Sequence, residues 1–203
     1  MANEDHKPDR TPSADSLAAA ARAARAKGPP PVHLWNPPYC GDLDIRIARD
    51  GTWFYLGTPI GRKPLVRLFS SILKREDARY FLVTPVEKVG IVVDDAPFVA
   101  VDFEVEGAGR DQRITFTTQV EDTVAAGPDH PIRVDRDPTT GEPAPYVHVR
   151  AGLDALIDRK SFYRLVDLGT EEVVAGERQF GVRSGGAFFP FMPADELDRL
   201  TLR

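Results

Sequence analysis

The chain has 203 residues, of which 42% are hydrophobic and 28% charged, with a formal net charge of −5. This length allows one large or two small domains with a buried core, and the acidic balance argues against general binding to duplex nucleic acid, which needs concentrated lysine and arginine. Cys40 is the only cysteine, which excludes an intrachain disulfide.

The first residues are acidic where a signal peptide would be basic. No apolar run approaches the roughly 20 residues that a membrane-spanning helix needs. We therefore expect a cytoplasmic protein without a membrane span.

Residues 1–31 are expected to form a flexible tail. The Ala/Arg run at 17–27 has high helix propensity, but its length is marginal for an isolated helix in water. Three prolines at 29–31 then form a stiff spacer. We expect disorder or a loosely attached helix here.

Residues 32–90 are expected to form an N-terminal α+β domain. An Asp50-Gly51 turn joins two short strands at 44–47 and 52–56. Pro64 is suited to the first turn of a helix, and apolar residues then recur at helical spacing: Leu65, Leu68, Phe69, Ile72 and Leu73. Strands are predicted at 80–83 and 86–93.

Residues 91–203 are expected to form a β-rich C-terminal domain. Alternating apolar residues predict antiparallel strands at 98–105 and 113–120. Further strands are predicted at 132–134 and 146–150, a helix at 153–168, and a closing hairpin at 179–191. The fold class is therefore α+β with mostly antiparallel sheets.

One segment of the chain occurs twice. Ile60-Gly61-Arg62-Lys63 is followed 97 residues later by Ile157-Asp158-Arg159-Lys160, and both continue with Arg-Leu-apolar. Upstream, residues 45–50 are similar to residues 132–137, so the related segments occur in the same order along the chain. Such self-similarity predicts an internal duplication of a β-β-α-β unit. Two related basic segments would then face a shared ligand.

Four ordered motifs resemble an uncharacterised bacterial family, domain of unknown function 1285. They are Trp35-x-Pro37-x-x-Cys40-Gly41-Asp42, Asp50-Gly51-Thr52-Trp53, Pro59-Ile60-x-Arg62-x-x-Leu65-Val66-x-Leu68-Phe69 and Leu82-Val83-Thr84-Pro85-Val86-Glu87-Lys88. The resemblance spans about residues 35–191. It implies a duplicated core, a C-terminal part like a pleckstrin-homology barrel, a nucleotide-like ligand at the domain interface, and a role in signal transduction.

Two basic pairs, Arg62-Lys63 and Arg159-Lys160, precede or open predicted helices. Cations there oppose the helix dipole, and a bound anion would reverse that penalty. The pairs are therefore candidate ligands for a phosphate or carboxylate. The alternative is that they are solvated residues of the first turn, or that the arginines hold neighbouring strands.

Other candidates surround the expected cleft. Trp35 and Tyr39 offer flat faces for stacking on a ring, or they staple the N-terminal segment onto the core. Thr84 and Lys88 line the cleft, or Glu87 and Lys88 form a surface pair. The four histidines show no metal-ligand spacing, so we expect neither a metal nor a cofactor.

No set of nucleophile, base and metal ligands emerges, and we favour a protein without catalysis. The preferred hypothesis is a regulatory protein that binds a small anionic, nucleotide-like ligand in the cleft between its domains. Two alternatives stay open: a protein-interaction adaptor that uses the tail, and an enzyme acting on a phosphorylated small molecule.

Overall fold

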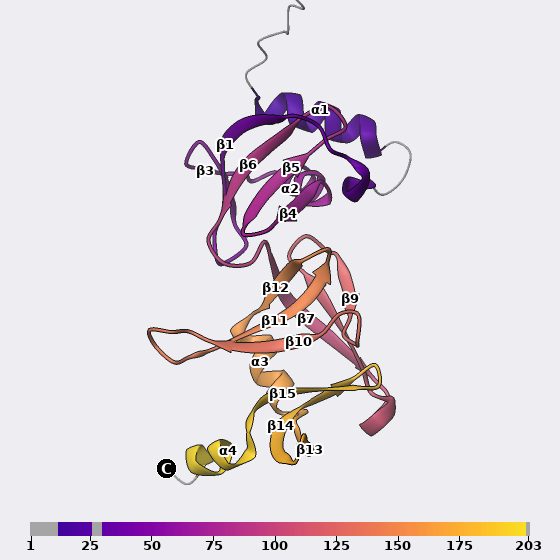
Figure 1. Cartoon of the computed structure of the whole chain (residues 1–203), viewed down its shortest axis with the longest axis vertical. Coiled ribbons are helices and arrows are strands. Elements are labelled where there is room, and N and C mark those ends of the chain that lie inside the picture. Colours follow the sequence, from indigo (N-terminus) through magenta and orange to yellow (C-terminus); the bar gives the residue numbers. More distant parts are fainter. Residues whose placement is uncertain (1–11, 26–29, 202–203) are drawn as a thin grey trace, which may run out of the picture. The chain divides into compact units, whose positions relative to one another are not determined.

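The structure, a computed structural model, describes residues 12–25 and 30–201 (Figure 1). The chain forms two compact units. Unit 1 comprises the described residues up to Ile47 and those of Thr52–Val93, and unit 2 comprises Ala48–Gly51 and the described residues from Asp94 onward. The first eleven residues of the expected tail, and residues 26–29 with part of its proline spacer, lie outside the described residues.

Unit 1 contains a six-stranded sheet in the order β3-β2-β1-β6-β5-β4. Its two central strands, β1 and β6, are parallel, and the other neighbours are antiparallel. The strands are β1 (Tyr39–Ile47), β2 (Trp53–Tyr55), β3 (Thr58–Pro59), β4 (Leu73–Glu76), β5 (Arg79–Val83) and β6 (Lys88–Val93).

The two faces of this sheet are covered differently. Ile45, Leu82 and Val89 share one face by register and are fully buried. Helix α2 (Lys63–Ser71) packs there, where Phe69 stacks on Trp53 with ring centroids 6.3 Å apart. The short helix η1 (Val32–Leu34) covers part of the opposite face, since Val32 clusters with residues of β5.

Helix α1 (Ala14–Arg25) packs against α2. Its buried side chains, Ala14, Leu17, Ala18 and Ala21, recur at helical spacing and form one face. The packing partner that a marginal helix of this length requires is therefore supplied by α2.

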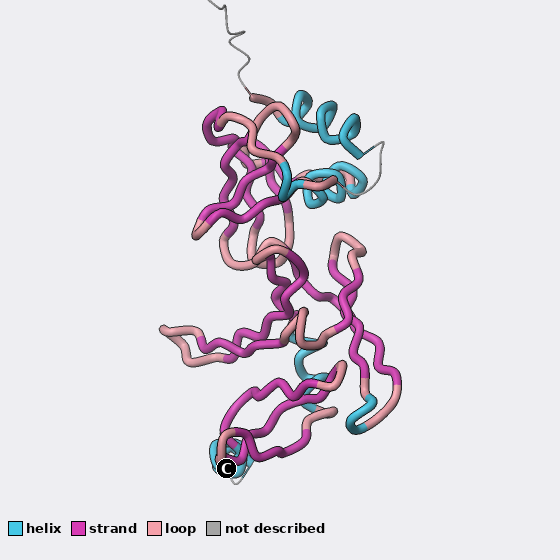
Figure 2. The backbone as a smooth tube through the Cα atoms, turned by 45° about the vertical axis from the view of Figure 1, so that its right-hand side comes forward, coloured by secondary structure: helices cyan, strands magenta, loops and turns pink. Residues whose placement is uncertain are grey.

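Unit 2 contains a six-stranded sheet in the order β10-β11-β12-β7-β8-β9 and a three-stranded sheet in the order β13-β14-β15. Figure 2 draws the strands in magenta. The strands of the larger sheet are β7 (Phe98–Glu106), β8 (Arg113–Thr118), β9 (Thr123–Ala125), β10 (Ile132–Arg136), β11 (Pro143–Arg150) and β12 (Leu153–Ile157). The smaller sheet comprises β13 (Thr170–Val174), β14 (Glu177–Ser184) and β15 (Ala187–Pro193). Only β7 and β12 pair in parallel among these strands of the described chain.

Helix α3 (Arg159–Val166) contacts both β7 and β14 and so links the two sheets of unit 2. Phe162 of α3 lies against Phe191 of β15, with ring centroids 5.6 Å apart. The 3-10 helix η2 (Gly109–Asp111) also contacts β14, and helix α4 (Ala194–Thr201) packs on β14 and β15.

The hydroxyl of Ser184 ties the tip of the β14–β15 hairpin to the larger sheet. This side chain is fully buried, accepts a hydrogen bond from the Ile114 N–H at 2.8 Å, and donates one to the Ala126 carbonyl at 2.8 Å. Because Gly185 has a φ of +58° and a Cβ there would lie 2.7 Å from the Ala126 oxygen, the tip fits only a glycine.

The sequence prediction of an α+β protein with mostly antiparallel sheets is confirmed at this level. The predicted helix at 153–168 is wrong in its first part. Residues 153–157 form β12, which alternates buried and half-buried side chains beside β7, and the helix begins only after Asp158. Within the described residues, no helix has the length and apolar character needed to cross a bilayer.

Candidate functional site

A groove lined by basic residues lies between α1 and α2 in unit 1. Arg22 and Arg25, from the end of α1, and Pro64 and Leu68, from α2, line a pocket of about 360 Å³. Arg62 and Lys63 immediately precede Pro64 in the chain. We call Arg22, Arg25, Arg62 and Lys63, with the pocket beside them, the basic groove.

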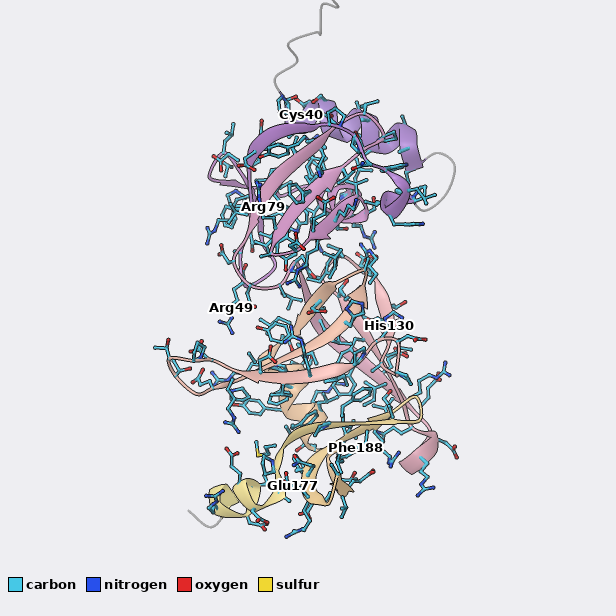
Figure 3. The ribbon with its side chains drawn as sticks, viewed as in Figure 1. Cys40, Arg49, Arg79, His130, Glu177 and Phe188 are labelled. Atoms are coloured by element: carbon cyan, nitrogen blue, oxygen red, sulfur yellow. The ribbon has the colours of Figure 1, made fainter. Side chains whose placement is uncertain are left out.

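The four cations of the basic groove are all exposed. None of these side chains makes a hydrogen bond or ion pair with another residue in the described part of the chain. Among the described residues, most other arginines are paired, as Arg79, labelled in Figure 3, is with Asp42 at 2.8 Å. The basic groove therefore concentrates positive charge that the described residues leave unneutralised.

The start of α2 offers an anion few backbone donors. Arg62 is the N-cap and makes no capping bond with its side chain. Its carbonyl accepts hydrogen bonds from the N–H groups of Leu65 and Val66, at 2.9 and 3.2 Å, and Pro64 has no N–H. The expected cradle of free backbone N–H groups thus reduces to that of Lys63, and the side chains must carry most of any binding.

The related pair in unit 2, Arg159 and Lys160, has different surroundings. Arg159 donates a hydrogen bond to the Tyr163 hydroxyl at 3.2 Å, and this bond raises the pKa of Arg159. Asp158 caps α3 by accepting a hydrogen bond from the Ser161 N–H at 2.7 Å. The start of α3 therefore already has a carboxylate of its own.

The aromatic candidates, Trp35 and Tyr39, do not line the pocket of the basic groove. Trp35 packs against the cluster of Val32, Phe81 and Val83. It also lines a separate pocket of about 590 Å³ together with residues of α1 and the β5–β6 turn. Tyr39 donates to the Asp42 carboxylate at 2.8 Å and accepts from Arg79 at 3.3 Å. Both residues therefore fit the stapling role that the sequence left open.

Thr84 and Lys88 are engaged inside unit 1. Thr84 is fully buried, and its hydroxyl closes the β5–β6 turn by accepting from the Glu87 N–H at 3.2 Å. Lys88 forms an ion pair with Glu76 at 2.8 Å, and Lys74 pairs with the same carboxylate at 3.0 Å. Hydrogen bonds from the two lysines, that from Lys88 first, lower the pKa of Glu76.

None of the eight site residues expected from the sequence lines this pocket, but Arg62 and Lys63 directly precede Pro64, which does. The sequence reasoning missed Arg22 and Arg25, because it treated the Ala/Arg run as a tail. Their spacing of three residues was the available signal, since it puts both on one side of a helix.

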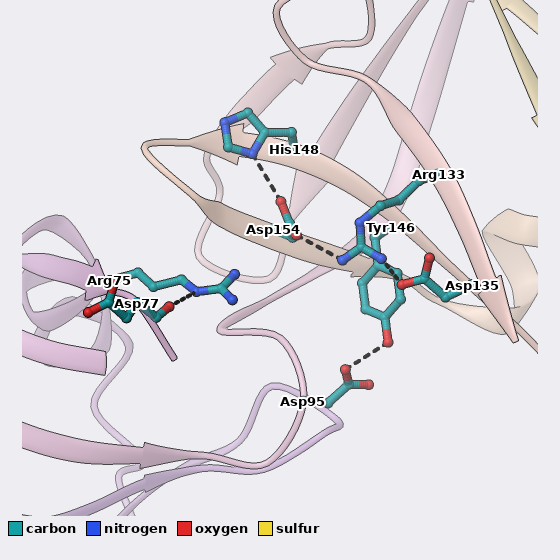
Figure 4. Close-up of polar contacts among 8 residues, drawn as sticks. All are labelled: Arg75, Asp77, Asp95, Arg133, Asp135, Tyr146, His148 and Asp154. Atoms are coloured by element: carbon teal, nitrogen blue, oxygen red, sulfur yellow. Dashed lines mark hydrogen bonds and ion pairs between the residues drawn. The ribbon is translucent and has the colours of Figure 1, made fainter. Parts of the chain in front are cut away.

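A second polar cluster lies in unit 2 (Figure 4). Arg133 pairs with Asp135 and with Asp154, whose other oxygen lies 3.0 Å from Nδ1 of His148. The buried Tyr146 donates to Asp95 at 2.7 Å, and burial followed by this bond raises the Tyr146 pKa. In the described chain no three histidine, cysteine or acidic residues group as metal ligands. The charged groups of this cluster are thus paired with one another.

Comparisons with known proteins identify relatives of the chain. Residues 30–96 match the family described as "Domain of unknown function (DUF1285), N-terminal domain", and residues 97–191 match its C-terminal domain. Functionally curated proteins give no match.

Two solved structures are similar. A DUF1285 family protein from Silicibacter pomeroyi DSS-3 has 68% sequence identity and a TM-score of 0.82, over 90% of this chain and 98% of that one. A DUF1285 family protein from Shewanella baltica OS155 has 30% identity and a TM-score of 0.48, over 61% of this chain and 90% of that one. The two domain matches cover most of the chain, which therefore belongs to the DUF1285 family.

Proposed function

We propose that this protein is a non-enzymatic, ligand-binding regulatory protein whose basic groove binds a small anionic ligand of nucleotide-like size. The observation that carries the proposal is the group of four basic side chains without partners in the described chain. The expected position of the ligand, in a cleft between the two domains, stays a prediction, as does a role in signal transduction.

The chemistry of the basic groove suits such a ligand. Arginine side chains bind phosphate or carboxylate through paired N–H donors, while the Lys63 ammonium adds a compact charge. Pro64 and Leu68 offer an apolar wall beside the cations. A pocket of about 360 Å³ falls within the usual range for small-molecule sites. These features support an anion with an attached apolar or ring portion.

Binding rather than catalysis is the better proposal for the basic groove. Its titratable side chains are arginine and lysine, and no histidine or carboxylate of the described chain lines the pocket. Proton transfer near neutral pH generally uses such groups. Cations alone hold and orient an anion, which suits a sensor.

We further propose that the chain arose by internal duplication. Each of two segments runs three strands, one helix and three strands: β1-β2-β3, α2, β4-β5-β6 and β10-β11-β12, α3, β13-β14-β15. The helices begin with the two related basic blocks. In the first segment, the first strand, β1, pairs with the last strand, β6. In the second segment, β10 lies beside β15 (Figure 1). We also propose a pleckstrin-homology-like C-terminal part, which the packing of helix α4 on β14 and β15 supports.

The test of the proposed function is a thermal-shift screen with AMP, GMP, ATP and inorganic pyrophosphate. Sodium chloride at matched ionic strength is the control, because a general salt effect would act through screening. We expect at least one anion to raise the melting temperature of the wild type, and an Arg62→Ala/Lys63→Ala variant to lose that shift. An Arg110→Ala variant, which removes an exposed arginine of unit 2, should keep it. No stabilisation by any anion, or equal stabilisation in the double variant, would contradict the proposal.

A further inference from the structure

Helix α1 supplies two of the four cations of the basic groove, yet its own attachment rests on a small apolar contact. The side chains that it buries are those of Leu17 and three alanines. Alanine methyl groups remove little apolar area from water, and a helix of 12 residues is marginal in isolation. The contact between α1 and α2 therefore stabilises the docked helix only weakly.

The charges of the basic groove oppose this contact when no anion is bound. Docking of α1 brings Arg22 and Arg25 to the pocket that Pro64 and Leu68 of α2 also line, and Arg62 and Lys63 directly precede Pro64 in the chain. Like charges repel, so empty docking is penalised. An anion between the two sets of cations converts this repulsion into attraction on both sides.

We propose that α1 is a ligand-dependent strap: the anion that occupies the basic groove fastens α1 onto α2, and its loss frees the helix. This inference rests on the proposed function and adds its regulation. Because binding and docking are linked, the anion must strengthen docking by the same factor by which docking strengthens anion binding. The ligand would thus control whether the α1-facing side of α2 is covered.

The direct test is hydrogen exchange of the α1 amides in the wild-type protein, with inorganic pyrophosphate or with sodium chloride at matched ionic strength. We expect pyrophosphate to slow exchange in α1 by about fivefold or more, the lower end of usual allosteric couplings. Exchange in β11 and β12 of unit 2 should not change. This experiment needs no variant and so does not depend on the folding of one.

Trp35 provides a second readout. It lines the pocket of about 590 Å³ together with Ala20 and Ala24 of α1, whereas Trp53 is only 2% exposed. Acrylamide, an uncharged quencher, therefore reports mainly on Trp35. We expect pyrophosphate to reduce quenching, because fastening α1 keeps one wall of this pocket in place.

The coupling also predicts an effect of a residue outside the basic groove. Leu17→Ala retains high helix propensity but removes the largest side chain that α1 buries. We expect it to weaken pyrophosphate binding about fivefold or more. Ala19→Gln, on the exposed side of α1, should bind like the wild type.

The outcomes separate the two proposals. If pyrophosphate binds but leaves α1 exchange unchanged, and Leu17→Ala binds it like the wild type, the strap is wrong and the anion site stands. If pyrophosphate, AMP, GMP and ATP all fail to bind the wild type, the proposed function is wrong and the strap falls with it.

Discussion

Gly61 and Asp158 hold corresponding positions in the two related blocks of this chain, but only Asp158 caps the helix that follows it. Its carboxylate accepts a hydrogen bond from the Ser161 N–H at 2.7 Å. In the first block, Gly61 has no side-chain acceptor, and Pro64, which corresponds to Ser161, has no N–H donor. The second block therefore contains its own carboxylate, whereas the basic pair Arg62-Lys63 of the first block has no anionic partner among the described residues.

Gly61→Asp should supply the missing carboxylate to the basic groove. A Cβ at this position meets no atom within 4 Å, and the φ of Gly61 is not in the left-handed region, so the change causes no strain. The new charge would neutralise part of the groove and favour the start of α2, by about 0.3–1 kcal/mol. We expect AMP binding to weaken about tenfold in calorimetric titration, with Gly61→Ala as the control that retains affinity. Unchanged binding by Gly61→Asp would place the ligand elsewhere.

Asp158→Ala should destabilise the protein without changing anion binding. Loss of an N-cap carboxylate typically costs about 0.5–2 kcal/mol. Asp158→Asn retains an acceptor for the Ser161 N–H, so its free energy of unfolding should be close to that of the wild type. Urea unfolding measures both variants, and a destabilisation of Asp158→Asn equal to that of Asp158→Ala would show that capping is not the cause.

Lys88→Ala should lower stability while leaving anion binding intact, because Lys88 is paired with Glu76. This partly buried pair contributes about 1 kcal/mol. Since the folded-state pKa of Glu76 is lowered, the contribution is present above its usual pKa of 4.5 and is lost as the pH falls. Stability measured at pH 7 and pH 3 should therefore differ less in Lys88→Ala than in the wild type. A loss of AMP affinity in this variant would instead return Lys88 to the ligand site.

The buried Tyr146 should make the protein sensitive to alkali. The pKa of its phenol is raised, first by burial and then by its bond to Asp95, so the folded protein retains a proton that the unfolded chain loses near the usual pKa of 10.0. This contribution is complete below pH 10 and is lost as the pH rises further. Tyr146→Phe should show a shallower fall in melting temperature between pH 9 and pH 11. A fall as steep as in the wild type would mean that other groups dominate.

Ser184→Ala should be strongly destabilising. The change removes the hydroxyl to which the buried Ile114 N–H donates and which donates to the Ala126 carbonyl. Each such loss costs about 1–3 kcal/mol, so we expect at least about 2 kcal/mol in urea unfolding. Ser71→Ala, which removes a bond within α2, is the matched control and should change stability little. Equal effects of the two changes would contradict the role of Ser184 as a link between sheets.

Local patterns were sufficient for many elements of the fold. The Asp50-Gly51 turn and the α2 repeat that begins at Leu65 depend on near neighbours, and the structure has both. The alternation predicted for β7 is only partly present, because Val99 and Phe103 are buried whereas Val101 and Val105 are exposed. Residues 153–157 were misassigned because a short apolar run fits a helix or a buried strand equally well. In the structure, these residues pair with β11 across a two-residue turn and with β7, more than 50 residues away, and periodicity reports neither pairing.

The site was less predictable than the fold. Arg62 and Lys63 could be selected because a helix start has a known dipole, but Arg22 and Arg25 join them only through packing of α1 on α2. Lys88 and Thr84 seemed available because their partners, Glu76 and the Glu87 backbone, become evident only in the folded sheet. Sequence spacing identifies charges, whereas tertiary contacts decide which of them stay unpaired.

Calorimetric titration of AMP into the wild type and into Arg22→Gln/Arg62→Gln tests the central claim most directly. We predict one saturable site in the wild type that weakens as salt is added, and at least tenfold weaker binding in the variant, which loses one cation from each side of the basic groove. Equal affinity for AMP in the two proteins, or failure of AMP, GMP, ATP and pyrophosphate alike to bind the wild type, would contradict the account.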